Sequence, residues 1–105
     1  MATKNYAGKT VEVDDEGFLV NYEDWTEDMA PEIAAEIGID GLNDMHWKVI
    51  NFMRADYKEK GQIPTIRRIK NAGGVPTKDV YNLFPEGPAK KAAMISGLGK
   101  PQGCV

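Results

Sequence analysis

The residue with the clearest chemical potential is Cys104, the only cysteine of the 105-residue chain and its last residue but one. A thiolate is a strong nucleophile whose reactivity depends on solvent access and nearby charge. Four of the last nine positions are glycine or proline: Gly97, Gly99, Pro101 and Gly103. This composition does not sustain a helix or strand. We therefore expect residues 97–105 to form a flexible arm that gives the thiol access to a partner's cleft.

Other catalytic partners for this thiol are scarce. A nucleophilic enzyme needs a base beside its thiol, and the only histidine, His46, precedes Cys104 by more than fifty residues. Sequence distance permits a Cys–His pair, but an incidental surface or core histidine is the more common case. One histidine and one cysteine make a poor ligand set, and no nucleotide-binding motif is present, so we expect no metal and no cofactor. These residues therefore give little support to a stand-alone enzyme.

Residues 63–84 form a second candidate functional segment, in which two short helical patterns flank a glycine-containing turn. This arrangement resembles a helix-turn-helix, and its first helix carries Arg67, Arg68 and Lys70, which could contact phosphates. The second helix carries a single cation beside an acidic residue and, apart from Asn82, lacks the cluster of side chains that read bases. With a net charge of −3, the chain is not expected to bind nucleic acid directly. The cations suit the arm, an anionic sulfur species or a partner protein better.

The elements that position these residues begin with a predicted β-hairpin. Residues 9–13 alternate between polar and apolar, and residues 18–20 form a second apolar run beyond the acidic turn 14–17. A first helix is expected after Thr26, which is a suitable N-cap, and should end at Gly38.

The strongest helical pattern runs from Asn43 to Lys60, with apolar residues at helical spacing. Shorter helices are expected from Pro64, from Pro76 to Phe84, and over residues 89–95. We expect the core aromatics to be Trp25, Trp47, Phe52, Tyr57, Tyr81 and Phe84. The predicted fold is α+β and mainly helical, with an N-terminal β-hairpin, about five helices and a helix-turn-helix-like unit. A globular domain over residues 1–96 would carry the flexible arm 97–105.

Composition supports a soluble, single-domain protein, since 42% of residues are apolar and 28% are charged. The N-terminus lacks the apolar stretch of a signal peptide, and a lone cysteine fits a reducing compartment, so we expect a cytoplasmic location without membrane association. Charge is unevenly distributed: residues 1–53 carry −9 and residues 54–105 carry +6. The basic half could meet an anionic partner, or the two halves could attract each other within the fold.

Taken together, these segments resemble the DsrC/TusE family over nearly the whole length. The matching stretches are DDEGFLVNYEDW, MHWKVINFMR, IPTIRRI, YNLFPEGPAKKA and GLGKPQGCV. The most specific is the pattern LFP-x-GP-x-K followed by an arm that ends in KP-x-GC-[VI]. The resemblance implies a helical domain with an N-terminal hairpin and a swinging C-terminal arm.

The resemblance also implies a role for Cys104, which would carry sulfur as a persulfide or join a trisulfide. Family members that work with sulfite reductase have a second arm cysteine eleven positions earlier, where this chain has Ala93. Alanine there fits a natural single-cysteine member or a substitution that traps one state of the arm. Either way, only a one-cysteine relay can operate. Arg67, in the family's P-x-x-R pattern, and Lys100 are candidates for stabilising the negative charge of the thiolate or persulfide.

Two branches of the family remain as alternatives. A single arm cysteine is typical of TusE, which passes sulfur toward tRNA thiolation, whereas the compact loop after residues 73–74 resembles the gamma partners of dissimilatory sulfite reductase. The implied donor is a sulfurtransferase or a TusBCD/DsrEFH-type complex. The implied acceptor is a tRNA-thiolation enzyme or sulfite reductase. In the second branch, the protein would act as a gamma subunit that docks its arm in the reductase.

Overall fold

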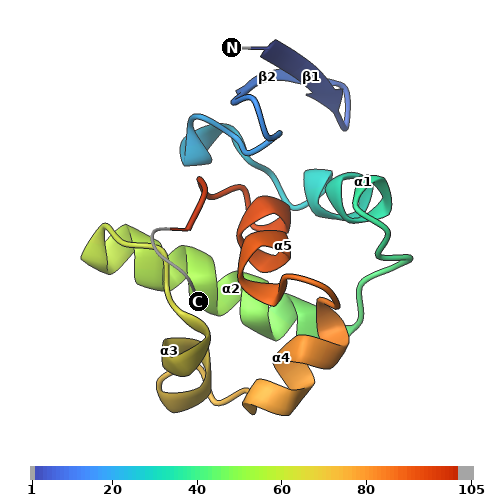
Figure 1. Ribbon diagram of the computed structural model, residues 1–105. Helices are drawn as coiled ribbons and strands as arrows, with labels where there is room; N and C mark the ends of the chain where they lie inside the picture. The colour runs from blue at the N-terminus through green and yellow to red at the C-terminus, as the bar shows by residue number, and fades with distance from the viewer. Residues whose placement is uncertain (1, 102–105) are drawn as a thin grey trace.

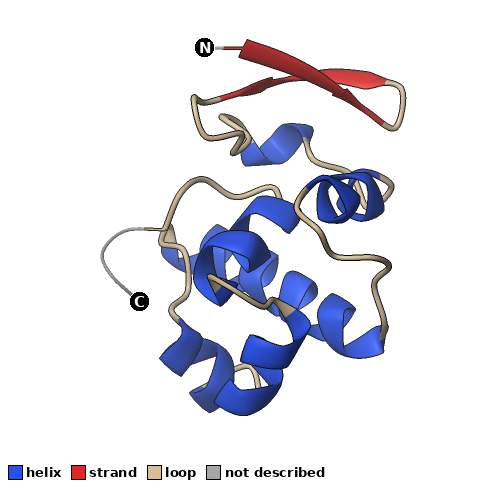
Figure 2. Cartoon of the chain, turned by 45° about the vertical axis from the view of Figure 1, so that its right-hand side comes forward, coloured by secondary structure: helices blue, strands red, loops and turns tan. Residues whose placement is uncertain are grey.

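The computed structural model describes residues 2–101 and confirms a mainly helical α+β fold with an N-terminal hairpin (Figure 1). The elements in chain order are β1 (Ala2–Tyr6), β2 (Lys9–Val13), the short 3-10 helix η1 (Tyr22–Asp24), α1 (Met29–Glu36), α2 (Asp44–Lys60), α3 (Ile66–Asn71), α4 (Thr77–Leu83) and α5 (Pro88–Ile95). The hairpin lies at one end of the molecule and the pair α3 and α4 lies at the other (Figures 1 and 2).

The hairpin uses a different partner strand from the one predicted. Strand β2 pairs with β1 in antiparallel register, from Ala2 opposite Val13 to Tyr6 opposite Lys9. The connecting residues Ala7 and Gly8 both have positive φ, 53° and 80°. A two-residue turn of this kind matches the natural twist of a hairpin, so it sets the pairing.

The predicted second strand, residues 18–20, contributes only one bridge, between Val13 and Leu19. The acidic turn does reverse the chain, because the Asp14 carboxylate accepts hydrogen bonds from the backbone N–H groups of Glu16 and Phe18. Phe18 and Leu19 are consecutive and both are buried. Strand residues alternate between two faces, so this burial pattern does not extend the sheet.

Helix α1 begins at Met29, three residues after the predicted cap Thr26. The residues between them form turns, in which Met29 donates to the Thr26 carbonyl and Ala30 donates to the Glu27 carbonyl. Its carboxylates hold the hairpin in place. Glu36 accepts hydrogen bonds from Lys4 Nζ at 2.9 Å and from the Tyr6 hydroxyl at 2.8 Å. Glu32 accepts one from the Ala7 backbone N–H at 2.9 Å.

Helix α2 follows the predicted bounds closely. The Asn43 side chain accepts from the N–H groups of Met45 and His46, and His46 Nδ1 accepts from the Asn43 N–H at 3.0 Å. Because Nδ1 is an acceptor, Nε2 carries the proton and donates to the Leu83 carbonyl at 3.0 Å. His46 is therefore a buried structural residue that caps α2 and joins it to α4. Gly61, with φ 72°, ends the helix in the left-handed conformation.

Helices α3 and α4 form the predicted helix-turn-helix-like unit. Thr65 caps α3 by accepting from the Arg68 N–H at 3.1 Å, and α3 buries two isoleucines against α2 and α4. Helix α4 buries Val80. Phe84, the residue directly after the helix, is also fully buried.

The expectation that Tyr81 is a core aromatic is wrong, since it is 52% exposed. It follows the buried Val80 directly, and neighbouring helical residues point about 100° apart, so it lies away from the core. Phe84 is buried, and the other four predicted core aromatics are partly buried.

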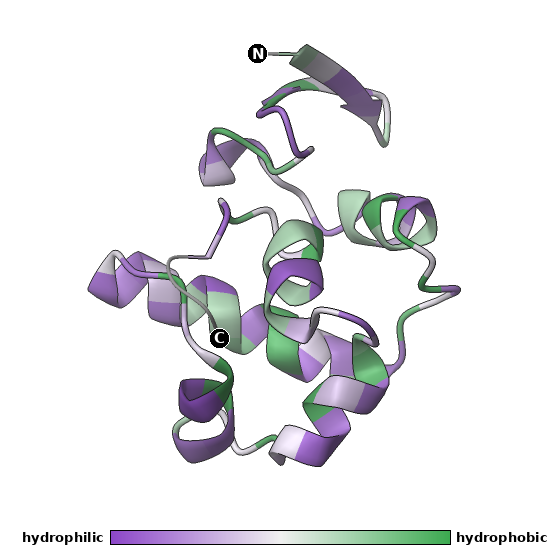
Figure 3. Cartoon of the chain, in the orientation of Figure 1, coloured by the Kyte–Doolittle hydropathy of each residue, from purple (hydrophilic) through white to green (hydrophobic). Residues whose placement is uncertain are grey.

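Helix α5 packs against both α1 and α2 (Figure 1). Its buried face consists mainly of alanines, Ala89, Ala92 and Ala93, followed by Ile95. Small side chains allow neighbouring helices to approach closely. Helix α5 accordingly lies at the centre of the core, in contact with α1, α2 and α4. Figure 3 shows polar and apolar residues on every helix, as expected for helices with one buried face. No helix within residues 2–101 is long and apolar enough to cross a membrane.

Candidate functional site

The predicted sulfur site, Cys104, lies outside the described residues, so the structural basis of the site is the base of the arm. Helix α5 ends at Ile95, and the next three N–H groups close its last turn: Ser96 donates to Ala92 at 3.0 Å, Gly97 to Met94 at 3.1 Å and Leu98 to Ala93 at 3.0 Å. This pairing satisfies carbonyls that a helix end otherwise leaves open.

The packed part of the chain extends beyond the predicted boundary at residue 96. Ser96 and Leu98 are both 0% exposed. Gly97 lies between them with φ 73°, a conformation that favours glycine. Residues 97 and 98 are therefore buried with the core, while the division into a globular domain over residues 1–96 and a flexible arm stays a prediction.

Trp25 contacts the arm base directly. Its indole Nε1–H donates to the Ile95 carbonyl at 2.8 Å. A Cβ atom added at Gly97 would lie 2.3 Å from Trp25 Cδ1, far inside van der Waals contact. Position 97 therefore requires glycine for two reasons, its backbone conformation and the closeness of the indole.

Arg54, on α2, joins three segments at the same place. Its Nη1 donates to the Ser96 carbonyl at 2.8 Å, and its Nη2 donates to the Tyr22 carbonyl at 3.2 Å. Its Cζ lies 4.2 Å from the Trp25 ring centroid, within cation–π range. Burial lowers the pKa of Arg54. Within residues 2–101, no carboxylate forms an ion pair with it.

The sequence did not indicate a role for Arg54, and it indicated Trp25 only as a core aromatic. Arg54 follows a core methionine at the edge of the apolar stripe of α2, and this is the only local sign of its position. Its partners lie 32 and 42 residues away in sequence. No local pattern reports contacts at that distance.

Lys100, a predicted site residue, forms an ion pair with Glu16, with Nζ and Oε2 2.7 Å apart. The hydrogen bond with Glu16 raises the pKa of Lys100. About half of each side chain is exposed. The ion pair therefore ties the arm to the acidic turn between β2 and η1.

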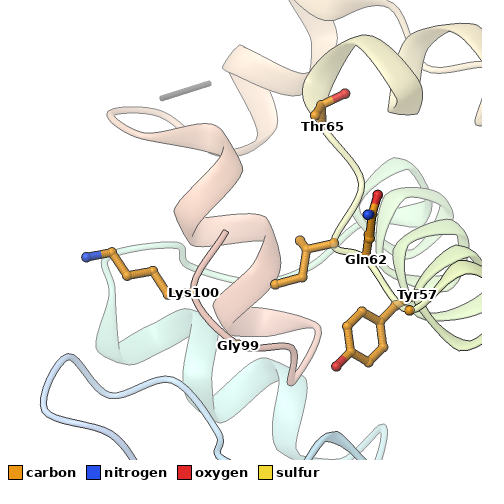
Figure 4. A pocket seen from close by; sticks show the side chains of 7 residues that line it. Tyr57, Gln62, Thr65, Gly99 and Lys100 are labelled. Carbon is orange, nitrogen blue, oxygen red and sulfur yellow. The ribbon is translucent and has the colours of Figure 1, made fainter. Parts of the chain in front are cut away.

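A pocket of about 480 Å³ lies beside the arm. It is lined by Tyr57, Gly61, Gln62, Ile63, Thr65, Gly99 and Lys100. In Figure 4 the Tyr57 and Gln62 side chains come from the α2–α3 side, while the Lys100 side chain extends away from them. The Tyr57 ring packs edge-on against the Tyr22 ring, with centroids 4.9 Å apart, which connects this wall to the segment that Arg54 holds.

Arg67, the third predicted site residue, is exposed on α3 and does not line this pocket. No described contact joins it to Lys100. Its neighbour Arg68 has a structural role instead: Nε and Nη2 donate to the two Asp56 oxygens at 2.8 and 2.7 Å. These hydrogen bonds lower the pKa of Asp56, whose side chain is 6% exposed.

Ala93, the position at which the family resemblance implies a second arm cysteine in other members, is 0% exposed in α5. Within residues 2–101, no cluster of three or more histidine, cysteine or acidic residues is arranged to hold a metal ion.

Comparison with known proteins decides the family. A family described as "DsrC like protein" matches residues 5–105. The chain belongs to the DsrC-like protein family. The dissimilatory-type sulfite reductase subunit gamma of Nitratidesulfovibrio vulgaris is 40% identical over 105 residues, covering all of both chains. The sulfurtransferase TusE of Yersinia pseudotuberculosis is 38% identical, covering 95% of this DsrC-like chain and 98% of TusE.

Solved structures agree with this assignment. A chain in the crystal structure of dissimilatory sulfite reductase I superposes with a TM-score of 0.88 at 37% identity, over 99% of this chain and 100% of that one. The oxidized gamma subunit, DsrC, of Archaeoglobus fulgidus gives a TM-score of 0.80 at 33% identity, over 99% and 100%. The DsrC-like fold therefore extends through the described part of the arm.

Proposed function

We propose that this protein is a sulfur carrier, in which Cys104 binds sulfane sulfur as a persulfide and relays it between partner proteins. The observation that carries the proposal is that the only thiol of the chain falls within the family match over residues 5–105, one residue before the end of that match. The names of the relatives, sulfite reductase subunit gamma and sulfurtransferase TusE, support a sulfur-relay role.

The transfer step is a thiolate displacement. The Cys104 thiolate attacks the terminal sulfur of a persulfide on the donor protein, a new S–S bond forms, and the donor's S–S bond breaks. The electron pair of the broken bond leaves with the donor thiolate, so no external oxidant or reductant is needed. Delivery repeats the same displacement, with an acceptor thiolate attacking the outer sulfur held on Cys104. Because position 93 is alanine, no second arm thiol competes for that sulfur.

Charge supports the choice of candidate binding residues. Arg67 is exposed and could pair with an anionic partner group. Lys100 is bound to Glu16, so it would have to exchange partners before it could stabilise the thiolate or persulfide. Exposed ion pairs are weak, so this exchange costs little. The proposed donors are a sulfurtransferase or a TusBCD/DsrEFH-type complex, and a tRNA-thiolation enzyme or sulfite reductase is the acceptor.

Mass spectrometry tests the proposal. After incubation with a rhodanese charged by thiosulfate, the protein should gain about 32 mass units, and a reducing agent should remove them. Cys104→Ser should abolish the gain. Gln102→Ser is the matched control, since it introduces the same side chain near the thiol and should load normally. A serine variant at position 104 that still gains sulfur would exclude the carrier role.

A second candidate role is that of a gamma subunit whose arm docks in a dissimilatory sulfite reductase. The alignment with the gamma subunit from Nitratidesulfovibrio vulgaris spans 105 residues and all of both chains, which agrees with the compact loop after residues 73–74. Co-purification with the reductase that persists in Cys104→Ser would favour this role. Binding that depends on the loaded thiol would favour the relay.

A further inference from the structure

The base of the arm is restrained more strongly than an ordinary helix end. Local N–H groups already close the last turn of α5, because Ser96, Gly97 and Leu98 donate to carbonyls within that helix. Even so, two long side chains from distant segments, Trp25 and Arg54, donate to the next carbonyls. These additional bonds fix the direction of the chain rather than merely completing the helix.

Arg54 is a partly buried charged residue, and this placement carries a cost that a purely structural task does not require. Removing a guanidinium from water is unfavourable, and the usual compensation is a carboxylate partner. Here the compensation consists of two carbonyl oxygens and the faces of Trp25 and Tyr22. An apolar side chain could fill the same space without this cost. What the guanidinium adds is geometry, since its rigid fork holds the Ser96 and Tyr22 carbonyls at fixed relative positions.

The restraints weaken along the arm. At residues 95–97, one indole, one guanidinium and a close glycine–tryptophan contact act together. At Lys100 the restraint found within residues 2–101 is an exposed ion pair with Glu16, which contributes little in water. The arm is therefore directed rigidly at its base and held weakly three residues later.

We propose that Arg54 and Trp25 are positioning residues for sulfur transfer, which set the direction in which the arm leaves the core after Leu98 and so present Cys104 to its partner. This inference rests on the proposed carrier function. Fixing the base of the arm reduces the number of arm orientations from which a partner must select. Loss of alignment at a reacting group can lower the reaction rate by orders of magnitude.

The test compares two arginines that make similar bonds at different places. Arg54→Met removes both carbonyl contacts at the arm base. Arg68→Met is the matched control, because it removes a two-donor contact between α2 and α3 in which no arm residue takes part. Arg54→Lys keeps the charge and one donor. Trp25→Phe removes the indole donor and part of the ring while keeping an aromatic face, and it remains informative if Arg54→Met fails to fold.

Three measurements separate positioning from stability. With thiosulfate-charged rhodanese as donor, Arg54→Met should lower kcat/KM for loading about tenfold, with partial recovery in Arg54→Lys. Alkylation of Cys104 by iodoacetamide, a small reagent that needs no aligned partner, should change by less than about twofold. Arg68→Met should lose stability while keeping the wild-type loading rate.

The third measurement does not depend on sulfur chemistry. A nitroxide attached to Cys104, the only thiol, broadens the amide NMR signals of residues near it. Arg54→Met and Trp25→Phe should change which amides broaden, and Arg68→Met should not. Unchanged broadening in both arm-base variants, or equal loading rates in Arg54→Met and Arg68→Met, would overturn the positioning role. Failure of the wild-type protein to load sulfur would instead remove the carrier function, and the broadening pattern would still decide how the arm is directed.

Discussion

The Trp25 indole donates to the Ile95 carbonyl at 2.8 Å, although the two residues are 70 positions apart. This bond joins the segment before α1 to the end of α5. It also places the indole against the backbone of residue 97. The tightest steric constraint at the arm base therefore comes from a residue far away in the sequence.

Gly97→Ala should destabilise the protein by roughly 2–5 kcal/mol. The left-handed backbone at φ 73° accounts for about 1–2 kcal/mol of this loss. Overpacking against Trp25, where the new Cβ would lie 2.3 Å from Cδ1, adds about 1–3 kcal/mol. Urea unfolding followed by circular dichroism measures the loss.

Two alanine controls divide that loss into its parts. Gly41→Ala introduces alanine at φ 94° with no atom within 4 Å, so it should show only the backbone cost. Gly99→Ala, which also has open space and no positive φ, should be close to neutral. Equal losses at positions 97 and 41 would mean that the indole moves aside readily.

Asn43→Ala should cost about 1 kcal/mol, because two N–H groups at the start of α2 lose their acceptor. Asn51→Ala, an exposed site in the middle of the same helix, is the control and should be neutral or slightly stabilising. Chemical denaturation of both variants provides the comparison. A wild-type midpoint for Asn43→Ala would show that water replaces the cap without loss.

The Asp56–Arg68 pair predicts acid sensitivity. Its hydrogen bonds lower the pKa of Asp56 below the ordinary value of 3.8, so the folded state favours the ionised carboxylate. This contribution is fully present above the ordinary pKa and is lost as the pH falls through the folded pKa. The contribution of this pair to the denaturant midpoint should therefore be constant between about pH 7 and 5. The midpoint should fall below about pH 4, where the contribution is lost.

Asp56→Asn should remove that part of the decline, leaving a shallower dependence of the denaturant midpoint on pH. Asp40→Asn, at an exposed loop position, should keep the wild-type dependence. If both variants follow the same curve as the wild type, the pair does not contribute to acid unfolding.

Ala93→Cys, made in a Cys104→Ser background, should introduce a thiol that iodoacetamide alkylates slowly. Position 93 is 0% exposed, so the reagent must wait for the end of α5 to open. The rate should be about tenfold or more below that of Ala35→Cys in the same background, since Ala35 is exposed on α1. Comparable rates would indicate that the packed segment through Leu98 opens frequently.

Much of the fold could be predicted from local sequence signals. The bounds of α2 followed from a capping residue, an apolar stripe and a terminal glycine, all within reach of neighbouring backbone groups. The short helices after Pro64 and Pro76 were predicted for the same reason. Strand β1 was missed because four of its five residues are exposed, so ATKNY shows no buried alternation. Its pairing depends on the turn at Ala7 and Gly8.

The sequence by itself also determined the candidate thiol, because Cys104 is unique and the family motifs surround it. Only the tertiary structure decided how the base of its arm is held. Arg54 and Trp25 show no unusual local pattern, yet their donors reach carbonyls 42 and 70 residues away. Helix caps and turns are short-range and can be recognised in a segment, whereas these contacts exist only once α1, α2 and α5 have packed together.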